Sequence, residues 1–300
     1  MRAALAGIVL AAASAVRAEP APATELAALA PAPDVRKVIA LGPHGELYEP
    51  DGKGAWLRHH TSTLAGYVIA ATRGASAIAA TRDGVAFRLA NDTWTVVGLG
   101  ANGPVIVGAG PRPLAASGRT MYALDRTPPV KLGDAPAPVV ALAASATGIV
   151  IETDAGLSRL AGSAWKPITG APLHVAALLS DRFALVDGGL LELATGKTIA
   201  WPSGLHVELA IASGDGVVAA AMRGTALELV TLHAGKLTSE PVPLDPPAPI
   251  VALAADRDGG VVLATRDGRL VVRDRGAWSA TVVRDELPPS RPGPPPALSK

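Results

Sequence analysis

Short apolar runs separated by Gly- and Asp-rich segments recur along most of the chain. The runs consist mainly of Val, Ile, Leu, Ala and Thr, and glycine interrupts them too often for helices to form. The dipeptide Asp-Gly lies between two such runs at Asp83-Gly84 and again at Asp267-Gly268. This dipeptide favours a two-residue hairpin turn because the turn requires positive φ. The pattern therefore predicts antiparallel hairpins of short strands.

The five tryptophans indicate that these hairpins are copies of one unit. Trp56 and Trp94 are 38 residues apart, and Trp165 and Trp201 are 36 residues apart. In three copies the same offset of 11 residues separates an aspartate from a tryptophan: Asp83 and Trp94, Asp154 and Trp165, Asp267 and Trp278. A fixed period of about 37 residues is typical of repeat proteins, in which one supersecondary unit is copied along the chain.

Each unit contains four apolar runs, which predicts an all-β fold of four-stranded meanders. First runs such as Val139–Ala144 are apolar at nearly every residue, so we expect them to be innermost strands that are packed on both faces. Later runs such as Arg269–Gly276 alternate, as expected of outer strands with one wetter face. One meander cannot bury both of its faces, so neighbouring units must stack, and radial stacking makes a β-propeller.

Counting the units predicts seven blades, with six or eight as the alternatives. Six complete blades begin near Tyr67, Pro104, Pro138, Leu173, Leu205 and Pro249. The first blade supplies strands two to four within residues 37–59, and Glu25–Ala30 is the only local candidate for its innermost strand. Alternatively, this blade is incomplete or another segment closes it.

The two ends of the chain do not show the repeat pattern. Arg2 precedes an apolar stretch, Ala3–Val16, and small residues follow, so we expect a secretory signal that is cut after Ala18. An uncleaved membrane anchor is the alternative. The predicted organisation is a signal peptide at 1–18, an Ala/Pro-rich linker at 19–34, the propeller at 35–285 and a Pro-rich disordered tail at 286–300.

Composition limits the cellular compartments in which the protein can reside and the classes of partner that it can bind. The chain has no cysteine, which excludes disulfides, thiol chemistry and a lipid anchor on cysteine, and is compatible with an exported protein of a bacterial envelope, periplasmic or extracellular. Without Arg2 and Arg17, 25 basic side chains face 26 acidic ones. A near-neutral surface with 3% aromatic residues does not favour nucleic-acid binding, and we expect no membrane span after signal removal.

Few residues are candidates for catalysis, metal binding or ligand binding. The six histidines show no HExxH motif or metal-ligand spacing, so we expect no metal site, no cofactor and no catalytic group. His174 and His206 open innermost strands of adjacent blades, where both should approach the central channel. Arg82, Arg223 and Arg266 should lie in turns on the same face and form a polar rim, as candidates for ligand or partner binding.

The segment Asp83–Trp94 resembles the repeats of bacterial secreted β-propellers, namely tectonin-type and sensor-propeller repeats. The WD-repeat family is similar in topology, but its Gly-His and Trp-Asp dipeptides are absent from this chain. Asn91–Trp94 also lacks the residue order of a sialidase Asp box. The resemblance implies a propeller and transfers no catalytic residue.

These observations predict an exported, non-enzymatic and monomeric β-propeller that acts as a scaffold for another protein or a ligand. A lectin-like, carbohydrate-binding propeller is the first alternative and would use outward-facing tryptophans. A hydrolase, lyase or oxidoreductase over the channel is the second alternative and would need acids or histidines that converge on one rim.

Overall fold

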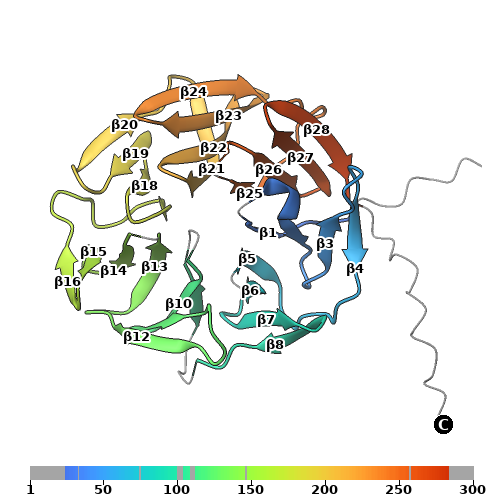
Figure 1. The fold of residues 1–300 in the computed structure, drawn as a ribbon. Helices are drawn as coiled ribbons and strands as arrows, with labels where there is room; N and C mark the ends of the chain where they lie inside the picture. Colours follow the sequence, from blue (N-terminus) through green and yellow to red (C-terminus); the bar gives the residue numbers. More distant parts are fainter. Residues whose placement is uncertain are drawn as a thin grey trace, which may run out of the picture.

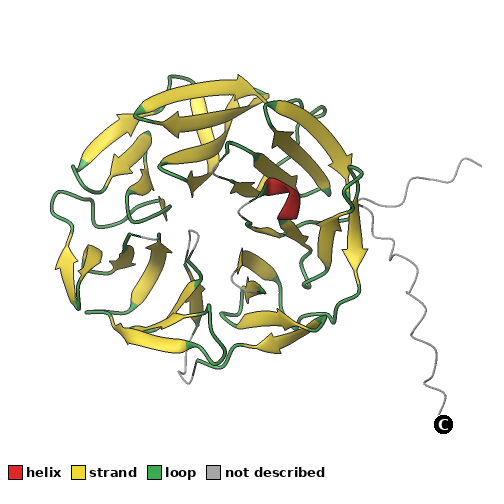
Figure 2. Cartoon of the chain, viewed as in Figure 1, coloured by secondary structure: helices red, strands yellow, loops and turns green. Residues whose placement is uncertain are grey.

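The chain forms seven four-stranded antiparallel sheets arranged around a central opening (Figure 1). The computed structural model describes residues 24–32, 34–73, 76–99, 104–108, 112–145, 147–256 and 258–283. Within these ranges the helical element is one short 3-10 turn, η1 (Val35–Lys37), which is drawn in red in Figure 2. No helix of the described part is long and apolar enough to cross a membrane. The predicted signal peptide and Pro-rich tail lie outside the described residues.

The strands follow one another from the channel outward in each blade. Blade one contains β1 (Ala28–Ala30), β2 (Ile39–Leu41), β3 (Leu47–Pro50) and β4 (Trp56–His59). Blade two contains β5 (Val68–Arg73), β6 (Ala77–Thr81), β7 (Ala86–Ala90) and β8 (Thr93–Val96). Blade three contains β9 (Val105–Val107), β10 (Leu114–Ser117), β11 (Thr120–Ala123) and β12 (Val130–Asp134). Blade four contains β13 (Val139–Ala144), β14 (Ile149–Thr153), β15 (Gly156–Ala161) and β16 (Ala164–Pro167).

The last three blades repeat the arrangement. Blade five contains β17 (Ala177–Leu178), β18 (Phe183–Val186), β19 (Gly189–Glu192) and β20 (Lys197–Ala200). Blade six contains β21 (Leu205–Ser213), β22 (Gly216–Arg223), β23 (Ala226–His233) and β24 (Lys236–Pro241). Blade seven contains β25 (Ile250–Ala255), β26 (Val261–Thr265), β27 (Arg269–Asp274) and β28 (Ala277–Val282). The prediction of seven four-stranded blades is confirmed.

Blade one has its own innermost strand, and this strand closes the ring. β1 pairs with β2 and contacts β25 of blade seven. Leu26 and Leu29 pack with Leu270 of blade seven, and the Val35 amide donates to Asp256 Oδ2 at 3.1 Å. The segment 25–30 therefore supplies the strand, and the domain boundary expected at residue 35 falls inside blade one. The ring closes by packing between blades, because each blade is built from one continuous stretch of chain.

Apolar clusters between neighbouring blades form the core. One such cluster joins blades one and two through Leu41, Leu47 and Trp94, and similar clusters lie at the other joints. Each blade therefore buries its two faces against its two neighbours. This arrangement explains why a four-stranded unit that is too small to hold a core alone is stable in the ring.

The expectation that innermost strands are packed on both faces holds for β1, in which every residue is buried, but not for the other blades. β13 and β25 each contain exposed or half-buried residues, whereas every residue of β14 and β26 is buried. An innermost strand has one strand neighbour and turns its other edge to the open channel. A second strand has strand neighbours on both edges and blades on both faces, so it is the most buried.

The tryptophans pack between blades. Trp94 is buried between blades one and two, and its Nε1 donates to the Gly45 carbonyl at 3.0 Å. Trp56, Trp165 and Trp278 likewise pack against the preceding blade around the ring. Trp201 lies beyond the end of β20 and packs on the following blade instead. The shared offset of these residues thus reflects packing.

Candidate functional site

One face of the ring gathers the turns between second and third strands and the starts of the innermost strands. The Arg82 amide donates to the Tyr67 carbonyl at 2.8 Å, and the Arg266 amide donates to the Pro249 carbonyl at 3.0 Å. In both blades the turn therefore lies beside the residue that leads into the innermost strand. We call this side the channel-mouth face. The prediction that the turns and the strand starts share a face is correct.

The Thr-Arg-Asp-Gly sequences form turns that present arginine. Thr81 is buried, its Oγ1 donates to the Val85 carbonyl at 3.2 Å, and the Gly84 amide donates to the Thr81 carbonyl at 2.9 Å. The Thr81 amide donates to the Val85 carbonyl at 2.9 Å, so the loop between these two residues has three residues, not the two we predicted. The third of them, Gly84, has φ +75°. Thr265 fixes the equivalent turn in blade seven. Buried threonines thus hold both turns and leave the arginine at the exposed corner.

Four side chains from blades one, two and seven act on Tyr67 by contact or by charge. The guanidinium of Arg82 stacks 4.9 Å from the centre of the Tyr67 ring, and the His44 ring meets the same ring edge-on at 6.4 Å. The Tyr67 hydroxyl donates to Glu25 Oε1 at 2.7 Å. Arg266 acts electrostatically on the phenol. We call Glu25, His44, Tyr67, Arg82 and Arg266 the Tyr67 cluster.

The electrostatics of this cluster follow from those contacts. The hydrogen bond to Glu25, burial and the charge of Glu25 together raise the pKa of Tyr67 above its ordinary value of 10.0, and the charges of Arg266 and Arg82 oppose this shift. Two guanidinium groups face one carboxylate, and that carboxylate already accepts the phenol proton. The Tyr67 cluster therefore carries positive charge that is not matched within it.

Bulges turn single side chains toward the channel. The register between first and second strands shifts in blades two, four, six and seven, at the second or fourth residue of the innermost strand. The residues at the shifts are Ile69, Val140, Glu208 and Val251, which we call the channel collar. Ile69 is 54% exposed and Val140 is 47% exposed. Glu208 is charged and exposed, and Val251 is half-buried against the core, so Ile69 and Val140 are the exposed apolar members of the channel collar.

The two predicted histidines are not brought together. His174 precedes β17, and its Nδ1 lies 3.0 Å from Oε1 of Glu152, a buried carboxylate of the preceding blade. His206 is the second residue of β21 and is exposed. No hydrogen bond or ring contact joins the two imidazoles, and no group of three or more metal-ligating side chains occurs within the described part of the chain. His174 is engaged between blades.

Arg223, the third predicted rim arginine, forms its hydrogen bonds within its own blade. Its Nε donates to Glu228 Oε1 at 2.6 Å, and its Nη1 donates to the Ser203 carbonyl at 2.9 Å. The hydrogen bond from Arg223 lowers the pKa of Glu228 below its ordinary value of 4.5, although burial opposes the shift. Arg223 therefore stabilises blade six and is not free for a partner.

This pair predicts an acid-dependent loss of stability. Because the pKa of Glu228 is lowered on folding, its contribution is present above pH 4.5 and is lost as the pH falls below that value. We expect the urea midpoint to fall over this range and Arg223→Gln to reduce the fall. Lys166→Gln, at an exposed site on β16, is the control. A pH profile of Arg223→Gln that matched the parent profile would contradict a role for the pair.

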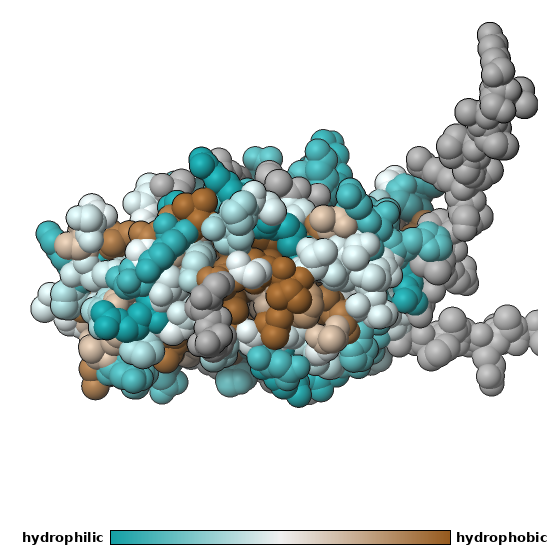
Figure 3. Space-filling model, turned by 90° about the horizontal axis from the view of Figure 1, so that it is seen from below, coloured by the Kyte–Doolittle hydropathy of each residue, from teal (hydrophilic) through white to brown (hydrophobic). Residues whose placement is uncertain are grey.

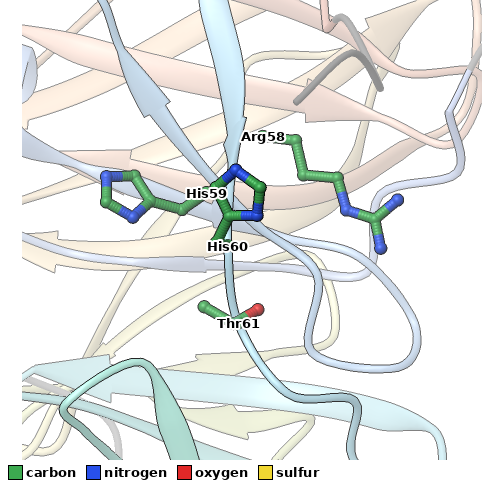
Figure 4. A pocket seen from close by; sticks show the side chains of 4 residues that line it. All are labelled: Arg58, His59, His60 and Thr61. Atoms are coloured by element: carbon green, nitrogen blue, oxygen red, sulfur yellow. The ribbon is translucent and has the colours of Figure 1, made fainter. Parts of the chain in front are cut away.

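Two hollows lie away from the channel-mouth face. One, of about 170 Å³ between blades one and seven, is lined by four carboxylates and two arginines, namely Asp34, Asp256, Asp258, Asp274, Arg36 and Arg275. The other, of about 290 Å³ on the flank of blade one, is lined by Arg58, His59, His60 and Thr61, but Arg58 and His59 point to opposite sides of their strand (Figure 4). His59 pairs with Glu49 at 3.2 Å. Viewed edge-on, the flank of blades two and three shows an apolar area among polar residues (Figure 3). The exposed Val96, Val130 and Leu132 lie on the outer strands of these blades.

Sequence reasoning found Arg82 and Arg266 but missed what lies between them. Tyr67 and Glu25 carry no motif, and the linker assignment placed Glu25 outside the propeller. The bulges of the channel collar had a signal in the first runs, where an extra apolar residue follows the first buried one, as in Val68-Ile69 and Val139-Val140. This signal is visible only once the register is known.

Comparison with known proteins identifies the fold. No protein-family model matches the chain, and no curated protein matches it. The WD40 β-propeller domain of Doa1 superposes with a TM-score of 0.58 and 14% identity, covering 87% of this chain and 94% of that one. YCF48 from Cyanidioschyzon merolae gives 0.55 and 14%, covering 84% and 96%. A chain of the mitotic checkpoint complex gives 0.55 and 13%, covering 90% and 98%.

At these identities the likeness shows the fold and nothing finer. The expected resemblance to WD-repeat and other β-propeller proteins is therefore confirmed for the architecture, with no particular family among them.

Proposed function

We propose that the protein is an exported scaffold that binds another protein through its channel-mouth face and performs no chemical step. The observation that carries this proposal is the composition of that face. Ile69 and Val140 of the channel collar are exposed aliphatic side chains, and the Tyr67 cluster on the same face holds two arginines without a carboxylate partner among the described residues. Apolar side chains next to arginine are typical of protein interfaces. Export is supported by the N-terminal sequence, with Arg2 before an apolar stretch.

The alternatives are less well supported by the site. A lectin-like ring would need outward-facing aromatic rings, but the tryptophans pack between blades. A channel-mouth enzyme would need acids or histidines that converge on that face. His174 pairs with Glu152, but this carboxylate is buried. The four carboxylates that share a hollow include Asp256, which follows the end of β25 and therefore lies on the opposite face. Neither alternative has a specific observation in its favour.

Affinity capture from the producing cell with two matched variants tests the proposal. Ile69→Asp places a charge in the channel collar, and Val96→Asp places the same charge at the apolar flank, where the parent side chain is 64% exposed. We expect one protein to be captured stoichiometrically, to be lost at least tenfold with Ile69→Asp, and to be retained with Val96→Asp. Absence of any captured protein, or loss with Val96→Asp alone, would overturn the proposal. Urea unfolding confirms that both variants are folded.

A further inference from the structure

Two arginines of the channel-mouth face have no carboxylate partner in the described structure. The turns between second and third strands carry Arg82, Arg119, Arg223 and Arg266. Arg119 donates to the Ala135 carbonyl at 2.9 Å, and Arg223 is paired with Glu228. By contrast, the side chains of Arg82 and Arg266 form no hydrogen bond or ion pair with any described residue, and both lie near Tyr67. These two guanidinium groups are the available donors of the face.

The Tyr67 ring orients one of these donors. A guanidinium stacked on an aromatic ring keeps its N–H groups in its own plane, free to meet a carboxylate with two parallel hydrogen bonds. The Tyr67 hydroxyl is tied to Glu25 at 2.7 Å, so the ring is held in place under Arg82. The hydrogen bond from Thr81 Oγ1 to the Val85 carbonyl holds the turn that carries Arg82. Arg82 is therefore preorganised toward solvent.

Apolar side chains of the innermost strands lie in the same blades as the two arginines. The innermost strands β5, β1 and β25 are neighbours around the channel. Ile69 on β5 and Val251 on β25 are channel-collar residues at register shifts. Ile69 is 54% exposed, whereas Val251 is half-buried against the core between blades seven and one, and the short β1 between the two strands is fully buried. Ile69 lies in the same blade as Arg82, and Val251 lies in the same blade as Arg266.

We propose that this sector binds an acidic segment of the partner protein, in which one or two carboxylates are adjacent to an aliphatic side chain. The carboxylates accept from Arg82 and Arg266, and the aliphatic side chain covers Ile69 and Val251. The inference rests on the proposed function and names the chemistry of its partner. A polyphosphate ligand does not fit as well, because it offers no apolar group to cover the exposed Ile69.

Selection from a displayed library of random 12-residue peptides on the purified protein tests the proposal. The expected result is enrichment of Asp or Glu next to Leu, Ile or Val, which disappears when the Arg82→Ala, Arg266→Ala double variant is the bait. Enrichment of neutral or basic peptides, no enrichment, or the same peptides on the double variant would overturn it.

Fluorescence anisotropy with the strongest selected peptide then assigns the residues. We expect Arg82→Ala and Arg266→Ala each to weaken binding about tenfold, and Asn/Gln replacement of the acidic peptide residues to do the same. Arg82→Lys should restore only part of the affinity, because a lysine keeps the charge without the planar fork. Lys166→Ala is the charge-matched control and should change affinity less than about twofold. Equal affinity for the acidic and amide peptides would contradict carboxylate recognition.

The two proposals fail separately. If a captured partner is lost with Ile69→Asp while no acidic peptide is selected, the scaffold proposal stands and the acidic-segment proposal falls. If acidic peptides bind while no cellular protein is captured, the site exists and the scaffold function is wrong.

Discussion

Replacing Gly268 with alanine is expected to lower the free energy of unfolding by about 2–4 kcal/mol and to loosen the joint between blades seven and one. Gly268 has φ +80°, and a Cβ there would clash with the Thr24 carbonyl oxygen. A backbone atom cannot move aside as the end of a flexible side chain can. Thr24 also leads directly into the buried Leu26 and the closing strand β1. The measurement is urea unfolding at equilibrium, with hydrogen exchange of residues 28–30 reporting on the joint.

Gly276 offers a matched control for this variant. It has the same φ of +80°, but a Cβ there would meet no atom within 4 Å. Gly276→Ala should therefore show the backbone strain alone, about 1 kcal/mol. The difference between the two variants isolates the contact with Thr24. Equal losses would mean that the N-terminal segment does not pack against the blade-seven turn.

Replacing Trp94 with alanine is expected to lower the free energy of unfolding by about 3–5 kcal/mol. The Trp94 side chain is buried between blades one and two, and its loss leaves both a cavity and an unpaired Gly45 carbonyl. Trp94→Phe should cost less, because the ring remains and only the hydrogen bond is lost. Urea unfolding of the variants gives the values.

Trp165→Ala is the control for Trp94→Ala, because the two tryptophans occupy the same position within the repeat. Trp165 follows Asp154 at the offset that separates Trp94 from Asp83, and its Nε1 also donates to a carbonyl of the preceding blade, that of Asp134 at 3.1 Å. Trp165 is only partly buried, however, so Trp165→Ala should cost about half as much as Trp94→Ala. Equal costs would show that the repeat position, and not burial, sets the energy.

Most of the fold was predictable because the information lies within each repeat. The predicted starts of the blades near Tyr67, Pro104, Pro138 and Pro249 fall one residue before β5, β9, β13 and β25. Blade five is the exception. Its innermost strand β17 has only two residues and begins at Ala177, four residues after the predicted start at Leu173, because the chain there first reaches across to place His174 against Glu152 of blade four.

The candidate site was predictable in part. The sequence indicates which turns carry arginine and, through strand polarity, that these turns share a face. It does not show that Arg223 is already paired with Glu228 while Arg82 and Arg266 remain available. Pairing of an arginine depends on neighbours from other strands, and the repeats differ at those positions.

The sequence by itself determined the period, the four-stranded unit, the number of blades and the positive-φ glycines of the turns, because these features depend on residues a few positions apart. Only the tertiary structure decided which faces of the innermost strands meet water, which blade each tryptophan packs against, and how residues 25–30 close the ring against blade seven. It also decided that Glu25, Tyr67, Arg82 and Arg266 meet. The physical reason is that a circular arrangement brings the first and last blades together, and no local pattern records that contact.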